Sequence, residues 1–179
     1  MNFIIYDIEA TCWEDRRGRA SEIIEIGAIK VNDYAEVEDT FCQFVKPVIH
    51  PFLSPFCMEL TSINQVDVNR ADKFYAVVEA FQDWIDIFDE EYLLCSWGKY
   101  DKTQMIKDCQ FHDMDWEWAE EHIDLKAQYK DYRKLSKPYG FKKALKREGF
   151  EFEGTHHRGI HDAYNLAKIF GKLFDVWQY

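Results

Sequence analysis

The chain has 179 residues, 47% of them hydrophobic and 17% aromatic, which excludes a disordered chain and is enough for one domain with a proper core. The formal net charge of −11 is unusual for a nucleic-acid-binding protein, so the chain is either a metal-dependent enzyme with cation-neutralised carboxylates or a protein that never contacts nucleic acid. There is no apolar run of membrane-spanning length and no secretory signal, and five widely spaced cysteines predict free thiols in the cytoplasm, with no membrane partner.

Three strands are predicted in the first part of the chain. Residues 2–9 form a near-continuous apolar run, which is typical of a central strand buried on both faces. Residues 22–31 and 37–46 are predicted as two further strands, joined by a turn near Asn32 and ended by Pro47. A loop rich in Pro and Ser is expected to follow.

Helices predominate in the remainder of the chain. Apolar residues at helical spacing predict an amphipathic helix over 72–88, and a short strand is predicted over 92–96. Further helices are predicted over 99–110, 125–135, 139–148 and from about residue 160 onward. This order predicts a single α/β domain over 1–179, with a mixed five-stranded sheet and helices on both faces. A ribonuclease-H-like fold agrees with the order of elements, although the order alone does not single it out.

Two carboxylates are predicted at the end of the first strand. Asp7 and Glu9 are two residues apart, so both side chains leave the same face of the strand. Most such pairs lie on a solvated surface, but here the apolar residues 3–8 lead directly into the pair. Adjacent buried acids cost desolvation and repulsion, which a divalent cation such as Mg²⁺ offsets.

Two further acids and a histidine lie at helix starts. Asp101 is expected in the first turn of a helix, where a single Asp more often serves only to complement the helix dipole. His157 and Asp162 flank the start of the last helix, and Gly159 is expected to let the chain bend so that both reach one site. An imidazole at such a site is a suitable general base. The neighbouring His156 and His161 are interpreted as surface or capping residues.

Taken together, these segments resemble the DEDDh (DnaQ-like) 3′–5′ exonucleases over nearly the whole chain. The resemblance rests on residues 7–12, 96–101 and 157–162, with support from the strand at 22–28. Residues 9–12, 53–63 and 69–72 make the sequence most similar to the branch of the histone-mRNA 3′-end exonuclease and its bacterial relatives. Ser62 stands where that branch has glycine, a difference that bears on the backbone geometry there.

The resemblance implies a two-metal hydrolysis of single-stranded RNA or DNA from the 3′ end, RNA being favoured, with release of nucleoside 5′-monophosphates. It implies two Mg²⁺ or Mn²⁺ ions, one held by Asp7, Glu9 and Asp162 and one by Asp7 with Asp101. It also implies that His157 takes the proton from the attacking water. No protein partner can be inferred.

The resemblance further implies a site for the terminal nucleotide. Its contacts would be the backbone of Ala10 and Thr11 and the side chains of Phe56, Leu60 and Tyr100, which tolerate any base. Phe56 and Leu60 could equally be core residues. A basic segment could guide phosphates to the site or be a solvated helix face: Lys137, Lys142, Lys143, Lys146 and Arg147, with Arg158 near the histidine.

Two other functions agree with the same residues. One is a non-catalytic binding module that keeps the fold, although such a module should have lost at least one acid or the histidine. The other is a phosphodiesterase that acts on dinucleotides, because the same two-metal site would serve.

Overall fold

The computed structural model describes residues 1–15 and 18–179. In these ranges six strands form one mixed sheet, in the order β4-β3-β2-β1-β5-β6. The strands are β1 (Asn2–Ala10), β2 (Ile23–Val31), β3 (Val37–Lys46), β4 (Asp72–Lys73), β5 (Tyr92–Ser96) and β6 (His122–Asp124). The predicted α/β class is confirmed, and so is the antiparallel arrangement of the first three strands.

Strand β1 lies between β2, which is antiparallel to it, and β5, which is parallel. Its side chains alternate between the two cores of the molecule. Ile4, Tyr6 and Ile8 face one core, and Phe3 and Ile5 face the other. Because Phe3 and Ile5 are on the odd-numbered face of β1, residues 7 and 9 continue along that same face.

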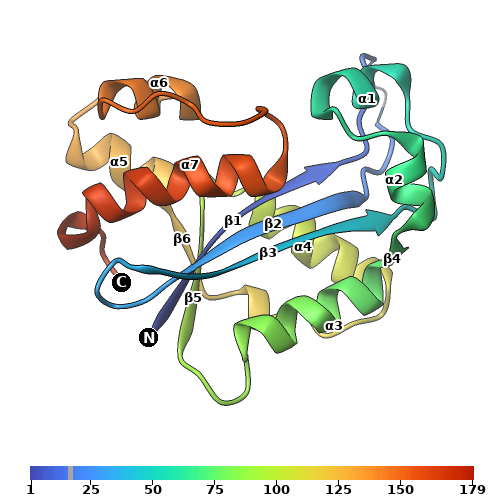
Figure 1. The fold of residues 1–179 in the computed structure, drawn as a ribbon, viewed down its shortest axis with the longest axis horizontal. Coiled ribbons are helices and arrows are strands. Elements are labelled where there is room, and N and C mark those ends of the chain that lie inside the picture. Colours follow the sequence, from blue (N-terminus) through green and yellow to red (C-terminus); the bar gives the residue numbers. More distant parts are fainter. Residues whose placement is uncertain (16–17) are drawn as a thin grey trace.

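Helices cover both faces of the sheet (Figure 1). On one face lie α3 (Phe74–Ile85) and α4 (Tyr100–Phe111), which pack around the first core. On the other lie α5 (Leu125–Tyr132), α6 (Phe141–Arg147) and α7 (Gly159–Lys172). Short 3-10 turns cover Glu117–Ala119 and Phe174–Val176. None of the helices in the described ranges has the length and apolar character needed to cross a membrane.

The prediction of five strands was wrong, because the sheet has six. The sequence located four strands, and the two that it missed are the three-residue β6 and β4, whose two residues pair in parallel with Val45 and Lys46. Two residues cannot show the alternation that identifies a strand, so this segment was assigned to the following helix. That helix begins at Phe74 and ends at Ile85, with Asp86 in the left-handed conformation (φ 67°).

The segment predicted as a loop after Pro47 contains two short helices, α1 (Pro55–Thr61) and α2 (Gln65–Arg70). The Ser54 hydroxyl accepts a hydrogen bond from the Cys57 N–H and caps α1 at its start. Ser62 ends α1 with φ 58°, a left-handed conformation that favours glycine. The chain therefore keeps the backbone turn at the position where the related branch has glycine.

Candidate active site

The C-terminal end of β1 meets the first turn of α7 at the end of the molecule that carries α1 (Figure 1). Ligand oxygen atoms of Asp7, Glu9 and Asp162 all lie within 4.8 Å of one another there. Burial and then the charge of the nearby Asp162 carboxylate raise the pKa of Glu9 to about 9. The pKa of Asp7 is also well above its ordinary value, because of burial and then the charge of Asp101. Such a cluster is destabilised unless protons or cations neutralise it.

Asp101 extends from the first turn of α4 toward the same strand. Its Oδ1 accepts a hydrogen bond from the Ile8 N–H at 3.2 Å, which fixes the carboxylate beside Asp7 and Glu9. Burial raises the pKa of Asp101 to about 6, while the Ile8 N–H opposes the shift. Its position next to the other acids favours a role in the site over simple complementation of the helix dipole.

Asp162 lies in the first turn of α7, as predicted, and is buried. Its Oδ2 accepts a hydrogen bond from the His157 N–H at 2.7 Å, and its Oδ1 lies 2.7 Å from His156 Nδ1. These contacts hold the segment before α7 against the carboxylate. The interpretation of His156 as an ordinary surface residue was incomplete, because its side chain is half-buried in this contact.

His157 projects into the site from the loop before α7. Its Nδ1 is 3.9 Å from Glu9 Oε1, and 40% of its side chain is exposed. Its ring packs on that of His156 with the centroids 4.0 Å apart. Burial and then the neighbouring His156 lower the pKa of His157 below its ordinary value. The imidazole is therefore neutral at neutral pH, the form that can accept a proton.

The chain bends at His157 itself, whose φ is 61°, rather than at Gly159. Gly159 is needed for close packing, because a Cβ there would lie 2.9 Å from the Asp7 carbonyl oxygen. On the opposite side of this contact, a Cβ at Gly27 would lie 2.0 Å from the Ile160 nitrogen. The two glycines let the start of α7 approach β1 and β2 closely enough to bring Asp162 to Asp7.

A buried ion pair anchors the same helix start. Both Nε and Nη2 of Arg158 donate to the Glu25 carboxylate, and the Gly159 N–H donates to Glu25 Oε2 at 2.9 Å. Glu25 is fully buried on β2, where it pairs with Glu9 across the strands. The prediction that Arg158 guides phosphates is not supported, since its guanidinium is committed to Glu25.

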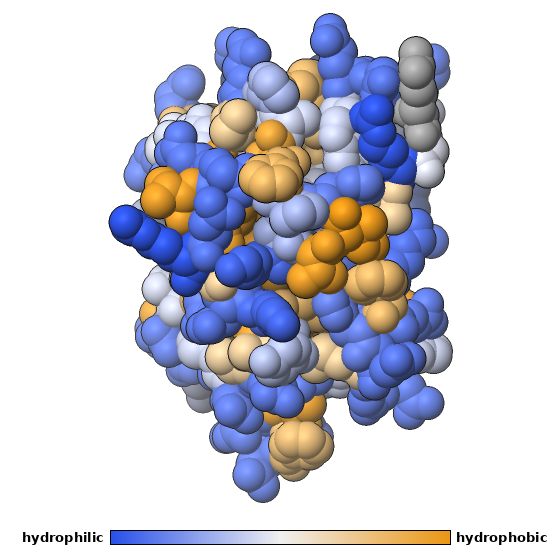
Figure 2. Space-filling view, turned by 90° about the vertical axis from the view of Figure 1, so that its right-hand side faces the viewer, coloured by the Kyte–Doolittle hydropathy of each residue, from blue (hydrophilic) through white to orange (hydrophobic). Residues whose placement is uncertain are grey.

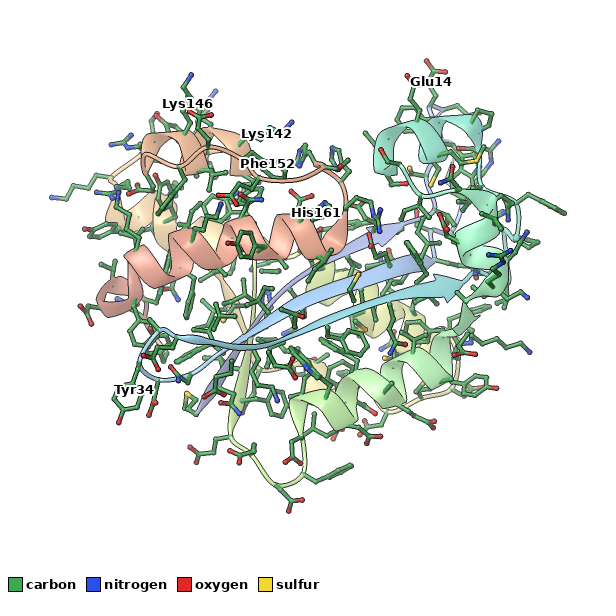
Figure 3. The ribbon with its side chains drawn as sticks, viewed as in Figure 1. Glu14, Tyr34, Lys142, Lys146, Phe152 and His161 are labelled. Carbon is green, nitrogen blue, oxygen red and sulfur yellow. The ribbon has the colours of Figure 1, made fainter. Side chains whose placement is uncertain are left out.

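His161 was predicted to be a surface or capping residue, and its contacts agree with that. Its Nδ1 accepts a hydrogen bond from the Thr155 N–H at 3.0 Å, and its ring packs over Gly154. In Figure 3 it lies at the start of α7. It does not line the cavity around the acids.

The three predicted nucleotide-contacting side chains are all more than a third exposed, and of the three only Tyr100 lines the cavity that holds the acids. Phe56 is 38% exposed and Leu60 37%, one turn apart on α1, so neither is a core residue. Tyr100 is 57% exposed at the start of α4. The end of the molecule that carries α1 shows apolar side chains at its surface, separated by hydrophilic ones (Figure 2).

Helix α1 is tied to the end of β1, where Ala10 and Thr11 lie. The Ser54 hydroxyl donates to the Cys12 carbonyl oxygen at 2.6 Å, and Cys57 Sγ lies 3.8 Å from the Ala10 carbonyl oxygen. The Thr11 N–H already donates to the Glu22 carbonyl oxygen, so it is not free for a nucleotide. A contact from the Thr11 backbone would have to use its carbonyl oxygen.

The acids line a cavity of about 290 Å³. Asp7, Glu9, Asp101, His157 and Asp162 all contribute to its wall, so the five residues predicted as catalytic are brought together. Sequence reasoning missed four lining side chains: Trp97, Phe141, His156 and Leu166. Only Trp97 had a signal in the sequence, because it directly follows the strand that precedes Asp101.

A ribonuclease-H-like sheet with acids converging at the end of its central strand defines a nuclease-type metal site. The chain belongs to the Exonuclease family (RNase_T), whose sequence pattern matches residues 4–170. The resemblance expected from the motifs is thereby confirmed. Exonucleases of the DEDD type depend on metal ions, and the acidic cluster of Asp7, Glu9 and Asp162 has the composition of such a site.

Individual relatives agree with the family. The chain is 32% identical to ERI1 exoribonuclease 2 of Xenopus laevis and to 3′-5′ exoribonuclease 1 of Homo sapiens, over 95% and 92% of its own length. It spans only 28% and 50% of those two proteins. Among solved structures, the nuclease domain of 3′hExo, a DEDDh family member bound to rAMP, is 31% identical with a TM-score of 0.91. That match covers 97% of this chain and 92% of the other.

Proposed function

We propose that this chain is a 3′–5′ exonuclease that hydrolyses single-stranded nucleic acid, RNA in preference to DNA, and releases nucleoside 5′-monophosphates. The observation that carries the proposal is the convergence of four carboxylates and one neutral imidazole on a single cavity. The exoribonuclease activity named for 3′-5′ exoribonuclease 1 supports the direction of digestion and the preference for RNA. The rAMP bound to the 3′hExo nuclease domain supports a nucleotide product.

The acids fit divalent cations. Oxygen atoms of three carboxylates lie within 4.8 Å of one another, and the raised pKa of Glu9 shows how strongly this arrangement favours neutralisation. In the proposal, Asp7, Glu9 and Asp162 hold one Mg²⁺ or Mn²⁺ ion, and Asp7 and Asp101 hold a second. When bound, the ions stabilise the negative charge that develops on the attacking and leaving oxygens.

The remaining chemistry belongs to side chains of this chain. His157 accepts a proton from the attacking water, for which its lowered pKa suits it. Asp162 positions His157 through the His157 N–H. Phe56, Leu60 and Tyr100 present exposed apolar surface on which the terminal base rests, and Ala10 and Thr11 support the sugar.

The basic helix α6 remains a candidate guide for phosphates. In Figure 3, Lys142 and Lys146 project from α6 on the side away from the sheet, and Lys142 is nearer to the start of α7. The charge of Lys142 acts on His157 and helps to lower its pKa. The Lys143 ammonium group lies over the Tyr139 ring, 3.9 Å from the ring centroid. This cation–π contact makes Lys143 less available to a phosphate than Lys142.

The proposal treats residues 1–179 as one exonuclease domain that works in the cytosol. Support for the location comes from the cysteines, all five of which lie in the described ranges and are free thiols. Free thiols are stable in a reducing compartment.

The experiment is an incubation with 5′-labelled single strands of RNA and of DNA, with Mg²⁺ and with a chelator. The proposal predicts a ladder that shortens by one nucleotide at a time with Mg²⁺ and no digestion with the chelator. RNA should be digested faster than DNA. Internal cleavage, or digestion that survives the chelator, would contradict the proposal.

The two alternative functions make different predictions in the same assay. A non-catalytic module with this fold would bind the strands and leave them intact. A phosphodiesterase for dinucleotides would hydrolyse a dinucleotide at least as well as an octanucleotide. Neither alternative has an observation in its favour here, because the acids and the histidine are all present and the site is open beside exposed aromatic residues.

A further inference from the structure

A second cavity, of about 380 Å³, adjoins the active site. It lies between α4, the segment before β2 and the segment after β3. Its principal lining side chains are Arg19, Ile49, Tyr100, Gln104, Lys107 and Phe111. Tyr100 lines both this cavity and the active-site cavity, so the two lie next to the same exposed side chain. A molecule longer than one nucleotide could therefore extend from one cavity into the other.

The second cavity carries two cations in a chain whose net charge is −11. Arg19 pairs with Asp15 at 2.7 Å, but both side chains are more than a third exposed, and such pairs contribute little stability. Lys107 is exposed, and within the described ranges the structure shows no ion pair for it. Lys107 is thus available to a phosphate. Arg19 becomes available when a phosphate displaces its exposed partner Asp15, while its guanidinium lies 5.2 Å from the centroid of the Trp13 ring.

The acid at the floor of the cavity is turned inward. Asp108 accepts hydrogen bonds from the Ile23 N–H at 2.7 Å and from the Gln104 amide at 2.8 Å. The same Gln104 amide also donates to the Ser21 carbonyl oxygen. Its two N–H groups are therefore used within the protein. Gln104 therefore has no amide N–H left to donate to a base. This favours binding without a preference for one base over another.

Two exposed aromatic rings mark the ends of the cavity along α4. Tyr100 is the first residue of the helix and Phe111 the last, and they are 57% and 53% exposed. At 1.5 Å per residue they are about 16 Å apart along the helix axis. This length exceeds the rise of about 3.4 Å between stacked bases several times, so it accommodates more than one nucleotide.

We propose that the second cavity binds the nucleotides immediately 5′ of the terminal one, with Arg19 and Lys107 on their phosphates and Phe111 against a base. The inference rests on the proposed exonuclease function and adds a route for the strand, along α4 rather than along α6. Alternating cations and aromatic rings are how proteins bind single strands without reading their sequence. The occupant is a single nucleic acid strand, because a terminal base that is still paired in a duplex would have to leave its stack to reach the acids.

The test compares a small substrate with a long one. The p-nitrophenyl ester of a nucleoside 5′-monophosphate fills only the active-site cavity, whereas a single-stranded octanucleotide would fill both. The variants are Lys107→Ala, Phe111→Ala and the pair combined. The matched controls are Lys73→Ala just before α3 and Tyr75→Ala on α3, an exposed lysine and an exposed aromatic residue that line neither cavity.

The inference predicts that Phe111→Ala raises KM for the octanucleotide by about tenfold or more, as loss of one stacked base should. Lys107→Ala should reduce the slope of log KM against log salt by about 1. Hydrolysis of the ester should be unchanged in every variant, and the controls should resemble wild type on both substrates.

Three results would overturn the inference alone. The first is a double variant with an unchanged KM for the octanucleotide, and the second is an equal loss on ester and octanucleotide. The third is an effect of Lys142→Ala on the octanucleotide without any effect of Lys107→Ala, which would place the strand along α6. A wild-type protein that hydrolyses neither substrate would instead contradict the proposed exonuclease function, and the strand-binding route with it.

Discussion

His157 is the residue on which the proposed proton transfer depends. Replacement by alanine removes the imidazole beside Glu9 and should lower the rate of hydrolysis about 100- to 10,000-fold, the usual effect of losing a general base. His161 lies four residues further on but bonds to the Thr155 backbone, so His161→Ala should change the rate little. The measurement is kcat for both variants at saturating Mg²⁺. Equal rates in wild type and His157→Ala would exclude this role.

Asp108 gives the fold a pH dependence that is separate from the metal site. Burial raises the pKa of its carboxyl group to about 6, above the ordinary value of 3.8, so the folded protein holds a proton that the unfolded chain releases. The stability that this proton contributes is present below pH 4 and is lost as the pH rises through 6.

Asp108→Asn keeps an oxygen for the Ile23 N–H and removes this titration, and it loses the hydrogen bond from the Gln104 amide at every pH. The variant should therefore gain stability relative to wild type between pH 4 and pH 7, by at most about 3 kcal/mol for a shift of about two pKa units. Urea unfolding of both proteins at the two pH values measures the gain. A difference in unfolding free energy that is the same at pH 4 and pH 7 would contradict this account.

The proposed catalytic residues could be predicted because each carries its own local signal. Asp7 and Glu9 end a buried strand, and Asp101 and Asp162 begin helices. The Glu25–Arg158 ion pair had no such signal, since its two residues are 133 positions apart and meet only in the folded sheet. For the same reason Arg158 was misassigned as a free cation. The contact between His156 and Asp162 was also missed, because it forms only where the chain turns at His157.

At the scale of elements, the approach of α7 to β2 decides whether the acids meet. A methyl group at Gly27 would lie 2.0 Å from the Ile160 backbone nitrogen, so the helix would have to move away from the strand. Gly27→Ala should therefore lower the free energy of unfolding by about 3 kcal/mol or more. Gly140→Ala is the control, since a methyl group there has nothing within 4 Å and its φ is −66°. Thermal unfolding that is equal for the two variants would refute the argument.

The long elements were predictable and the short ones were not. Strands β1, β2, β3 and β5 and helices α3, α4, α5 and α7 carry enough residues for an apolar period to appear. Helix α6 was also predicted, although with seven residues it is no longer than α1. Helices α1 and α2 have seven and six residues, and their apolar side chains are partly exposed, so composition favoured a loop. Strands β4 and β6 have two and three residues and are specified only by their neighbours in the sheet.

For the whole molecule, the net charge of −11 limits how tightly a strand can be held. Affinity for nucleic acid comes chiefly from phosphates neutralised by Lys and Arg, and few cations surround this site. We therefore expect distributive digestion, in which the strand dissociates between cuts. The measurement is a trap experiment, in which excess unlabelled strand is added after digestion has begun. Labelled strands that continue to completion would show processive digestion and contradict the expectation.

The central claim is that Asp7 and its neighbouring carboxylates form the hydrolytic site of an exonuclease. Asp7→Asn removes one of the mutually repelling charges and keeps the shape of the side chain. The account predicts that this variant unfolds at a higher temperature than wild type in the presence of chelator, because repulsion is relieved.

The most direct measurement is the release of nucleoside 5′-monophosphate from single-stranded RNA by wild type and Asp7→Asn side by side, with Mg²⁺. The account predicts steady release by wild type and none by the variant, although the variant is folded. Full release by Asp7→Asn, or release of oligonucleotides instead of mononucleotides by wild type, would contradict it.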